Sequence, residues 1–318
     1  MRRFVMAGLV CLGILGFGGG AAAQETVGKR FFSDTLVITE PFVEDELSLP
    51  SVLHIRRPAS DTEPRTLLTE IGGEVKKRLT PRLELSVAGA LSHLDPDGTA
   101  SVTRIENLTL GLKYQYFASE AHEAVLSAAL GWEVGGTGQR VAGAESLGVV
   151  NPALLFGKGL GDLPEDYAWL KPIAVNGVLG ALVPTRASTR RAPSAAGEAE
   201  LPPERHPNLL QWGLVVEYSV PYLQAHVRDV NLPPVINRIF PLVELDLQTA
   251  FDRGGRGATT GTVNPGFVWA GQSIQIGIEA VFPITSRTGK TPGVRAVFRV
   301  DLDEILPGLG RPLFGAKP

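Results

Sequence analysis

The chain has 318 residues, of which 44% are hydrophobic and 20% are charged, and its formal charge at pH 7 is −3. This mildly acidic balance, with no cluster of lysine and arginine, argues against nucleic acid as a partner, because phosphate contacts need such clusters. The single cysteine, Cys11, lies within the first 23 residues. The rest of the chain therefore has no disulfide and no thiolate chemistry.

Residues 1–23 have the three parts of a secretory signal peptide. Arg2 and Arg3 form a basic start, an uncharged apolar run covers residues 4–17, and three alanines at 21–23 form a small-residue cleavage site. The apolar run is shorter than the roughly 20 residues that a helical membrane anchor needs. We therefore predict a mature chain that starts at Gln24, which moves the formal charge from −3 to −5 by removal of the two arginines.

Residues 24–50 mix carboxylates with large apolar side chains. This segment is too apolar for a disordered linker. Three structures fit its composition: a plug inside the fold that follows, a segment packed at the periplasmic rim of that fold, or an additional strand. Its acidic residues after residue 30 are Asp34, Glu40, Glu44, Asp45 and Glu46.

From residue 51 onward, apolar and polar residues alternate in segments of about ten. Residues 107–116 are the clearest case, because every second residue from Leu108 to Tyr116 is leucine or tyrosine and the residues between are polar or glycine. Ten-residue segments with one apolar face are typical of a transmembrane β-barrel. We expect about twelve strands, near residues 51–57, 66–78, 82–92, 107–116, 126–134, 148–158, 168–182, 210–219, 243–248, 262–270, 274–282 and 294–302.

A soluble β-sandwich would also give alternation, but the connections favour a barrel. Tight turns at 79–81, 118–121 and 271–272 separate longer connections that are rich in Gly, Pro, Ser, Thr and charge. Outer-membrane barrels have short periplasmic turns and long external loops. The longer connections are 58–65, 93–102, 135–147, 184–207, 251–261 and 284–291.

We therefore predict an all-β protein, an antiparallel transmembrane β-barrel of about 12 strands (10–14) over residues 51–303. The barrel is expected in the cell outer membrane, with both termini periplasmic, because an even number of strands brings the two ends to one side. The long 220–237 connection on that side is expected to hold a short helix near 222–228. Residues 304–318 form a C-terminal tail.

Two stretches carry a resemblance to a known family. These are residues 107–116, with Gly-Leu-Lys-Tyr at 111–114, and residues 264–283, with Asn-Pro-Gly at 264–266 and a closing Pro283. The chain resembles the Gram-negative outer-membrane proteins named for the MetA pathway of phenol degradation. The resemblance implies a β-barrel that helps aromatic compounds or other small solutes to cross the outer membrane, and it implies no set of functional residues.

By the phase of the strands, side chains of both charges point into the barrel. A twelve-strand barrel has a narrow interior, so two interpretations stay open. The charges could pair and largely close the interior, or Arg295 and Arg299 could face acidic residues across a selective pore. The residues predicted to line the lumen are Glu84, Lys113, Glu133, Glu217, Glu244, Asp246, Glu279, Arg295, Arg299 and Asp301.

No motif for catalysis or metal binding occurs. Neither G-x-S-x-G nor H-E-x-x-H is present, and four of the five histidines fall in connections or at strand edges. We therefore predict no enzymatic activity, no cofactor, and outer-membrane lipid and small solutes as partners. The expected function is passive transport of small amphipathic or aromatic solutes. The alternative is a structural or docking barrel whose charged 184–207 loop meets surface partners.

Overall fold

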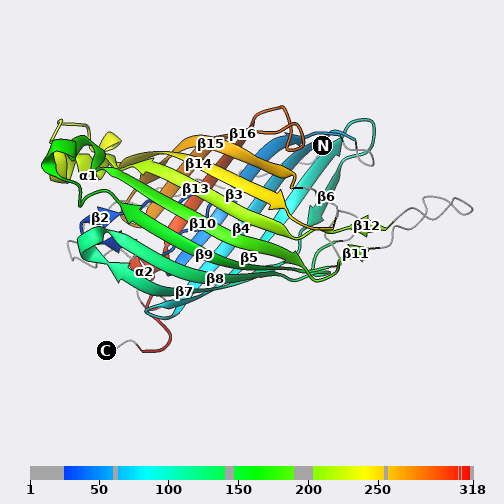
Figure 1. The fold of residues 1–318 in the computed structure, drawn as a ribbon, viewed down its shortest axis with the longest axis horizontal. Helices are drawn as coiled ribbons and strands as arrows, with labels where there is room; N and C mark the ends of the chain where they lie inside the picture. Colours follow the sequence, from blue (N-terminus) through cyan, green and yellow to red (C-terminus); the bar gives the residue numbers. More distant parts are fainter. Residues whose placement is uncertain are drawn as a thin grey trace, which may run out of the picture.

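The computed structural model describes residues 25–59, 64–139, 147–189, 203–253, 257–306, 308 and 310–315. Twelve strands form one closed antiparallel barrel (Figure 1), in which each strand pairs with the next along the chain and β17 pairs with β3. The predicted fold class is therefore confirmed. The barrel strands are β3 (Glu46–Arg57), β4 (Thr66–Thr80), β5 (Leu83–Pro96), β7 (Thr109–Ser119), β8 (Ala124–Glu133), β9 (Val149–Gly159), β10 (Ile173–Pro184), β13 (Leu209–Tyr218), β14 (Ile239–Ala250), β15 (Thr259–Ala270), β16 (Ile274–Pro283) and β17 (Gly293–Asp301).

The outer wall of the barrel is apolar. Successive side chains of a strand point to opposite faces, and the structure shows the predicted phase: Glu84 and Lys113 are buried, whereas Leu85 and Leu112 on the same strands are exposed. A closed sheet leaves no edge unpaired, which is what hydrocarbon requires of a membrane-spanning sheet. This architecture confirms the predicted location in the outer membrane.

A charge on the outer wall should impair membrane assembly. Leu112 lies in register with Leu85 and Leu130, and all three are exposed leucines. A charge at the bilayer midplane costs roughly 2–4 kcal/mol. We therefore expect Leu112→Arg to reduce the heat-modifiable, folded band on gels of outer-membrane fractions. Thr109 lines the interior on the same strand, so Thr109→Arg should leave that band intact. Equal loss from both substitutions would contradict the assignment of the faces.

The two ends of the barrel differ as the sequence indicated. Tight connections join β4 to β5 and β15 to β16, and the 3₁₀ helix η1 (Glu120–His122) joins β7 to β8. The same end carries η3 (Glu165–Leu170), α1 (Val220–Tyr222), the π-helix η4 (Leu223–Val227) and η5 (Ile236–Arg238), so the expected helix near 222–228 is present. The opposite end carries the long connections. There the short strand β6 (Val102–Ile105) pairs with β5, and β11 (Ser188–Thr189) pairs with β12 (Glu204–Arg205).

Two strands begin five residues away from their expected starts. β3 begins at Glu46, five residues earlier than expected, because the alternation already starts there: Glu46 is buried and Leu49 is exposed. β10 begins at Ile173 and not at 168, because residues before it form η3. Within the described residues, no helix is long and apolar enough to cross a membrane.

The N-terminal segment lies inside the barrel. Residues 25–45, called the plug below, contain the short paired strands β1 (Thr26–Val27) and β2 (Arg30–Phe31) followed by an irregular chain. Phe32, Asp34, Ile38 and Phe42 are all at most 2% exposed. These residues thus lie against the inner wall, whereas residues 46–50 of the segment belong to β3.

After β17 the chain forms α2 (Leu302–Ile305) and returns along the barrel end. The backbone N–H groups of Leu313 and Phe314 donate hydrogen bonds to the carbonyls of Arg78 and Leu79, at 3.2 and 2.8 Å. The tail is therefore hydrogen-bonded to the end of β4. Residues 1–24, with the predicted signal peptide, lie outside the described residues.

Candidate functional site

Two wall carboxylates hold the backbone of the plug. Glu244 on β14 accepts hydrogen bonds from the N–H groups of Leu36, Val37 and Ile38, the last two at 2.9 and 3.0 Å. Glu217 on β13 accepts from the N–H and the hydroxyl of Ser33, at 3.2 and 2.6 Å. Buried amides of an irregular chain need partners outside that chain, and the barrel wall supplies them.

Opposite these strands, three cationic wall residues meet the acidic residues of the plug. The Lys76 ammonium on β4 lies 2.9 Å from Glu44, 3.2 Å from Glu46 and 3.5 Å from Glu40. The Lys113 ammonium on β7 lies 3.2 Å from Glu84, whose carboxylate also accepts the backbone N–H of Glu44 at 2.8 Å.

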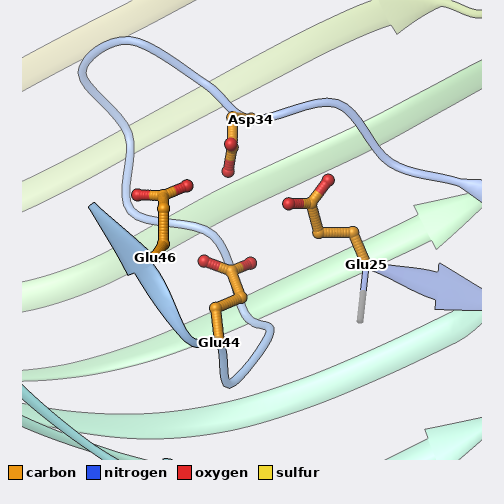
Figure 2. A group of neighbouring side chains, drawn as sticks. All are labelled: Glu25, Asp34, Glu44 and Glu46. Carbon is orange, nitrogen blue, oxygen red and sulfur yellow. The ribbon is translucent and has the colours of Figure 1, made fainter. Parts of the chain in front are cut away.

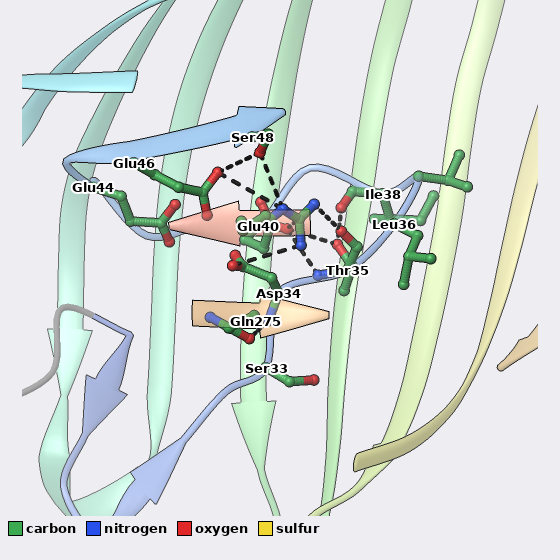
Figure 3. Close-up of polar contacts among 12 residues, drawn as sticks. Ser33, Asp34, Thr35, Leu36, Ile38, Glu40, Glu44, Glu46, Ser48 and Gln275 are labelled. Atoms are coloured by element: carbon green, nitrogen blue, oxygen red, sulfur yellow. Dashed lines mark hydrogen bonds and ion pairs between the residues drawn. The ribbon is translucent and has the colours of Figure 1, made fainter. Parts of the chain in front are cut away.

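Arg299 on β17 is the third cationic residue. Its guanidinium lies 3.6 Å from Asp34, 3.8 Å from Glu40 and 3.7 Å from Glu46. The same group donates hydrogen bonds to the Ser48 hydroxyl and the Thr35 carbonyl (Figure 3). One arginine therefore contacts the plug at several points along its length.

An apolar contact completes the seat of the plug. Leu36 and Ile38 pack with Leu155, Val178 and other buried residues of the inner wall. Glycines on the wall make room for these two side chains: a Cβ added at Gly277 would lie 2.8 Å from a methyl of Leu36, and one at Gly213 would lie 2.3 Å from Ile38. Residues 35–40, called the plug tip below, therefore face charged wall residues on one side and apolar wall residues on the other.

The buried plug carboxylates titrate differently from one another. Burial raises the pKa of Glu44 to about 7, against the attraction of Lys76. Burial also raises the pKa of Asp34 well above its ordinary value, although Arg299 opposes this. For Glu40, the attraction of Lys76, Arg299 and Lys113 exceeds the effect of burial and lowers its pKa. The wall therefore favours the ionised form of Glu40 more than that of Glu44 or Asp34.

The predicted lumen residues fall into two groups. Glu84, Lys113, Glu217, Glu244 and Arg299 contact the plug or its direct ionic partners. The others take no part in those contacts, although Asp301 lines a small cavity beside Glu25 and Glu44 of the plug. Arg295 pairs with Glu279 on the neighbouring strand at 3.0 Å, Glu133 accepts from Asn107 at 2.8 Å, and Asp246 and Asp301 are half-buried. Arg295 and Arg299 therefore have different acidic partners, since Arg299 contacts Asp34 and Glu40 of the plug.

Lys76, which pairs with Glu40 and Glu44 of the plug, is absent from the lumen residues predicted from the sequence. The phase of β4 was the available signal for Lys76. The plug has no periodicity, so nothing in its pattern indicated which wall residue each acid would meet.

Two interior cavities are lined in part by Leu36 of the plug. One, of about 570 Å³, is lined by Leu36 of the plug and by Arg57, Arg104, Glu106 and Glu133 near the long-loop end. The second, of about 270 Å³, lies beside residues 35–40, with Lys76, Lys113 and Arg299 among its charged lining and Leu155 and Val178 among its apolar lining. The plug tip therefore forms part of the lining of both interior spaces.

The fold matches solved barrels of the outer membrane. An outer-membrane channel from Pseudomonas putida F1 superposes with a TM-score of 0.56 at 14% identity, over 85% of this chain and 99% of that chain. The β domain of the Bordetella autotransporter BrkA superposes with a TM-score of 0.51 at 10% identity, over 81% and 99%. No family model and no curated protein matches the sequence. The chain thus has the fold of a channel or transporter barrel of the outer membrane, and at these identities the likeness concerns the fold.

Proposed function

We propose that the protein is a passive outer-membrane channel for small amphipathic or aromatic solutes, closed at rest by its own N-terminal plug. The proposal rests on the cavity beside residues 35–40, whose lining is partly charged and partly apolar. A solute with an apolar ring and a polar group can place the ring against Leu155 and Val178 and the polar group toward Lys113 or Arg299. A fold alone does not select a solute, so the chemistry of this lining is what indicates the class.

The size of the cavity sets the size of the solute. Pockets for drug-sized ligands have volumes of about 300–1,000 Å³, and this cavity of about 270 Å³ lies just below that range. Small monocyclic compounds fit that volume. Large oligosaccharides and peptides do not fit while the plug is seated.

Liposome swelling tests the proposal. Proteoliposomes with wild-type protein or with the Arg299→Glu variant are diluted into phenylalanine or glutamine, two zwitterions of similar mass that differ in their side chains. We expect phenylalanine to enter faster than glutamine, and both to enter faster through the variant than through wild type. Swelling no faster than that of protein-free liposomes for both proteins, each inserted and folded, would contradict transport and favour the structural barrel.

A further inference from the structure

Four carboxylates converge where the plug meets the start of the barrel. Glu25, Asp34 and Glu44 belong to the plug, and Glu46 is the first residue of β3 (Figure 2). One oxygen from each of the four lies within 4.8 Å of the others. All four side chains are at most 5% exposed, so water does not shield their mutual repulsion.

Several of these oxygens have no hydrogen-bond donor. Among the described residues, both carboxylate oxygens of Asp34, Oε1 of Glu44 and Oε2 of Glu46 are buried and accept no hydrogen bond. Figure 2 shows the Asp34 carboxylate directed toward the space between Glu25 and Glu46. A buried acceptor without a donor costs about 1–3 kcal/mol, and more when it is charged. A ligand at the point where these oxygens meet would remove that cost.

The neighbouring cationic residues do not balance the charge. Lys76 and Arg299 are the cationic side chains in contact with Asp34, Glu40, Glu44 and Glu46. Glu25 receives hydrogen bonds from the neutral amide of Gln275, at 3.0 and 3.1 Å. When all five acids are ionised, five carboxylates against two cationic groups leave an excess of three negative charges.

We propose that Glu25, Asp34, Glu44 and Glu46 bind one divalent cation, and that this cation is calcium. Calcium takes six to eight oxygen ligands at about 2.3–2.6 Å, so oxygens on opposite sides of the ion stand about 4.6–5.2 Å apart. The four oxygens lie within 4.8 Å of one another, so one ion can contact all of them. Magnesium usually keeps several of its water ligands and binds through one or two carboxylates, so a buried set of four carboxylates suits calcium better.

A small acidic cavity adjoins the cluster at the short-turn end of the barrel. This cavity, of about 30 Å³, is lined by Glu25 and Glu44 of the cluster and by Asp301, Asp303 and Glu304. That volume is close to the share of one water molecule in the liquid. The acidic lining attracts cations to this cavity.

Bound calcium would join three points of the plug to the first residue of the barrel. It would act beside Lys76 and Arg299 and hold residues 25, 34 and 44 together, although they are far apart along the plug. This site does not depend on the proposed transport, because an ion can bind to a barrel that passes no solute.

Isothermal titration calorimetry tests the site. Full-length mature protein, refolded in a synthetic detergent and treated with a chelator, is titrated with CaCl₂ and separately with MgCl₂ at pH 7.5. We expect one calcium ion per chain, with affinity at least tenfold higher than for magnesium. Asp34→Asn should weaken calcium binding at least tenfold, and Glu279→Gln, which removes a buried wall carboxylate outside the cluster, should leave it unchanged.

Folding of each variant is checked by heat-modifiable migration on gels. If Asp34→Asn does not fold, Glu25→Gln provides the same comparison, because that side chain already receives hydrogen bonds from Gln275. Absence of calcium binding by wild type, or equal binding by wild type and the folded cluster variant, would overturn the proposal. The calcium-binding test uses no channel measurement. A failure of the calcium proposal can therefore be told apart from a failure of the transport proposal.

Discussion

Replacing Arg299 by glutamate should open the plugged barrel and raise its single-channel conductance at least tenfold. Arg299 contacts Asp34, Glu40 and Glu46 and hydrogen-bonds Ser48 and the Thr35 carbonyl. Removing one partner of a buried ion pair costs about 3–5 kcal/mol. Reversing the charge at residue 299 adds a carboxylate to a site that already has an excess of carboxylates. Release of the plug relieves the repulsion between these carboxylates.

Arg295→Glu is the matched control. Arg295 lies four residues earlier on β17 and forms its ion pair with Glu279 of the wall, at 3.0 Å. We expect its reversal to disturb the wall locally and to leave conductance within about twofold of wild type. Planar-bilayer recordings compare the two variants. Equal conductance of the two, with both folded, would contradict the anchoring role of Arg299.

Displacing the plug by size alone should have the same effect without any change in charge. A Cβ at Gly277 would lie 2.8, 3.0 and 3.1 Å from three side-chain atoms of Leu36, so a leucine there needs the space that Leu36 occupies. Overpacking of a filled interior costs about 1–3 kcal/mol. We expect Gly277→Leu to unseat the plug tip and to increase conductance severalfold in the same recordings.

Gly72→Leu controls for adding a leucine to an inward-facing glycine. Gly72 lines the larger cavity, and the nearest atoms to a Cβ there are 3.6 Å or more away and belong to the barrel wall. This substitution narrows the cavity without contact with the plug, so conductance should fall or stay the same. An increase with Gly72→Leu equal to that with Gly277→Leu would show that the gain does not come from plug displacement.

The strands could be predicted where their two faces meet different surroundings. β7 and β5 alternate cleanly, since lipid contacts Leu112 and Leu85 while the interior holds Lys113 and Glu84. β9 and β10 alternate less clearly, because the inward residues Leu155 and Val178 pack against Leu36 and Ile38 of the plug and both faces are therefore apolar. The acidic start of β3 resembled the preceding segment and was assigned to it.

The interior site could be predicted only in part. Strand phase indicated that Arg299 and Glu244 point inward, but their partners come from a segment with no periodicity. Glu244 receives three consecutive backbone amides of the plug, and backbone amides carry no signal in a sequence. The pairing of Arg299 with Asp34 likewise depends on the three-dimensional course of residues 25–45, which composition does not determine.

The position of the plug within the chain bears on how the barrel is assembled. The plug precedes β3 directly, and β3 pairs with β17, the strand farthest from it in sequence. Arg299 is in register with Ser48, and Asp301 with Glu46, so the plug's charged anchors lie across this seam. Pairings between distant segments form late, because closing a long loop costs more entropy than closing a short one. A segment attached to the first strand is therefore enclosed as the sheet curls round it, and no threading through a finished tube is required.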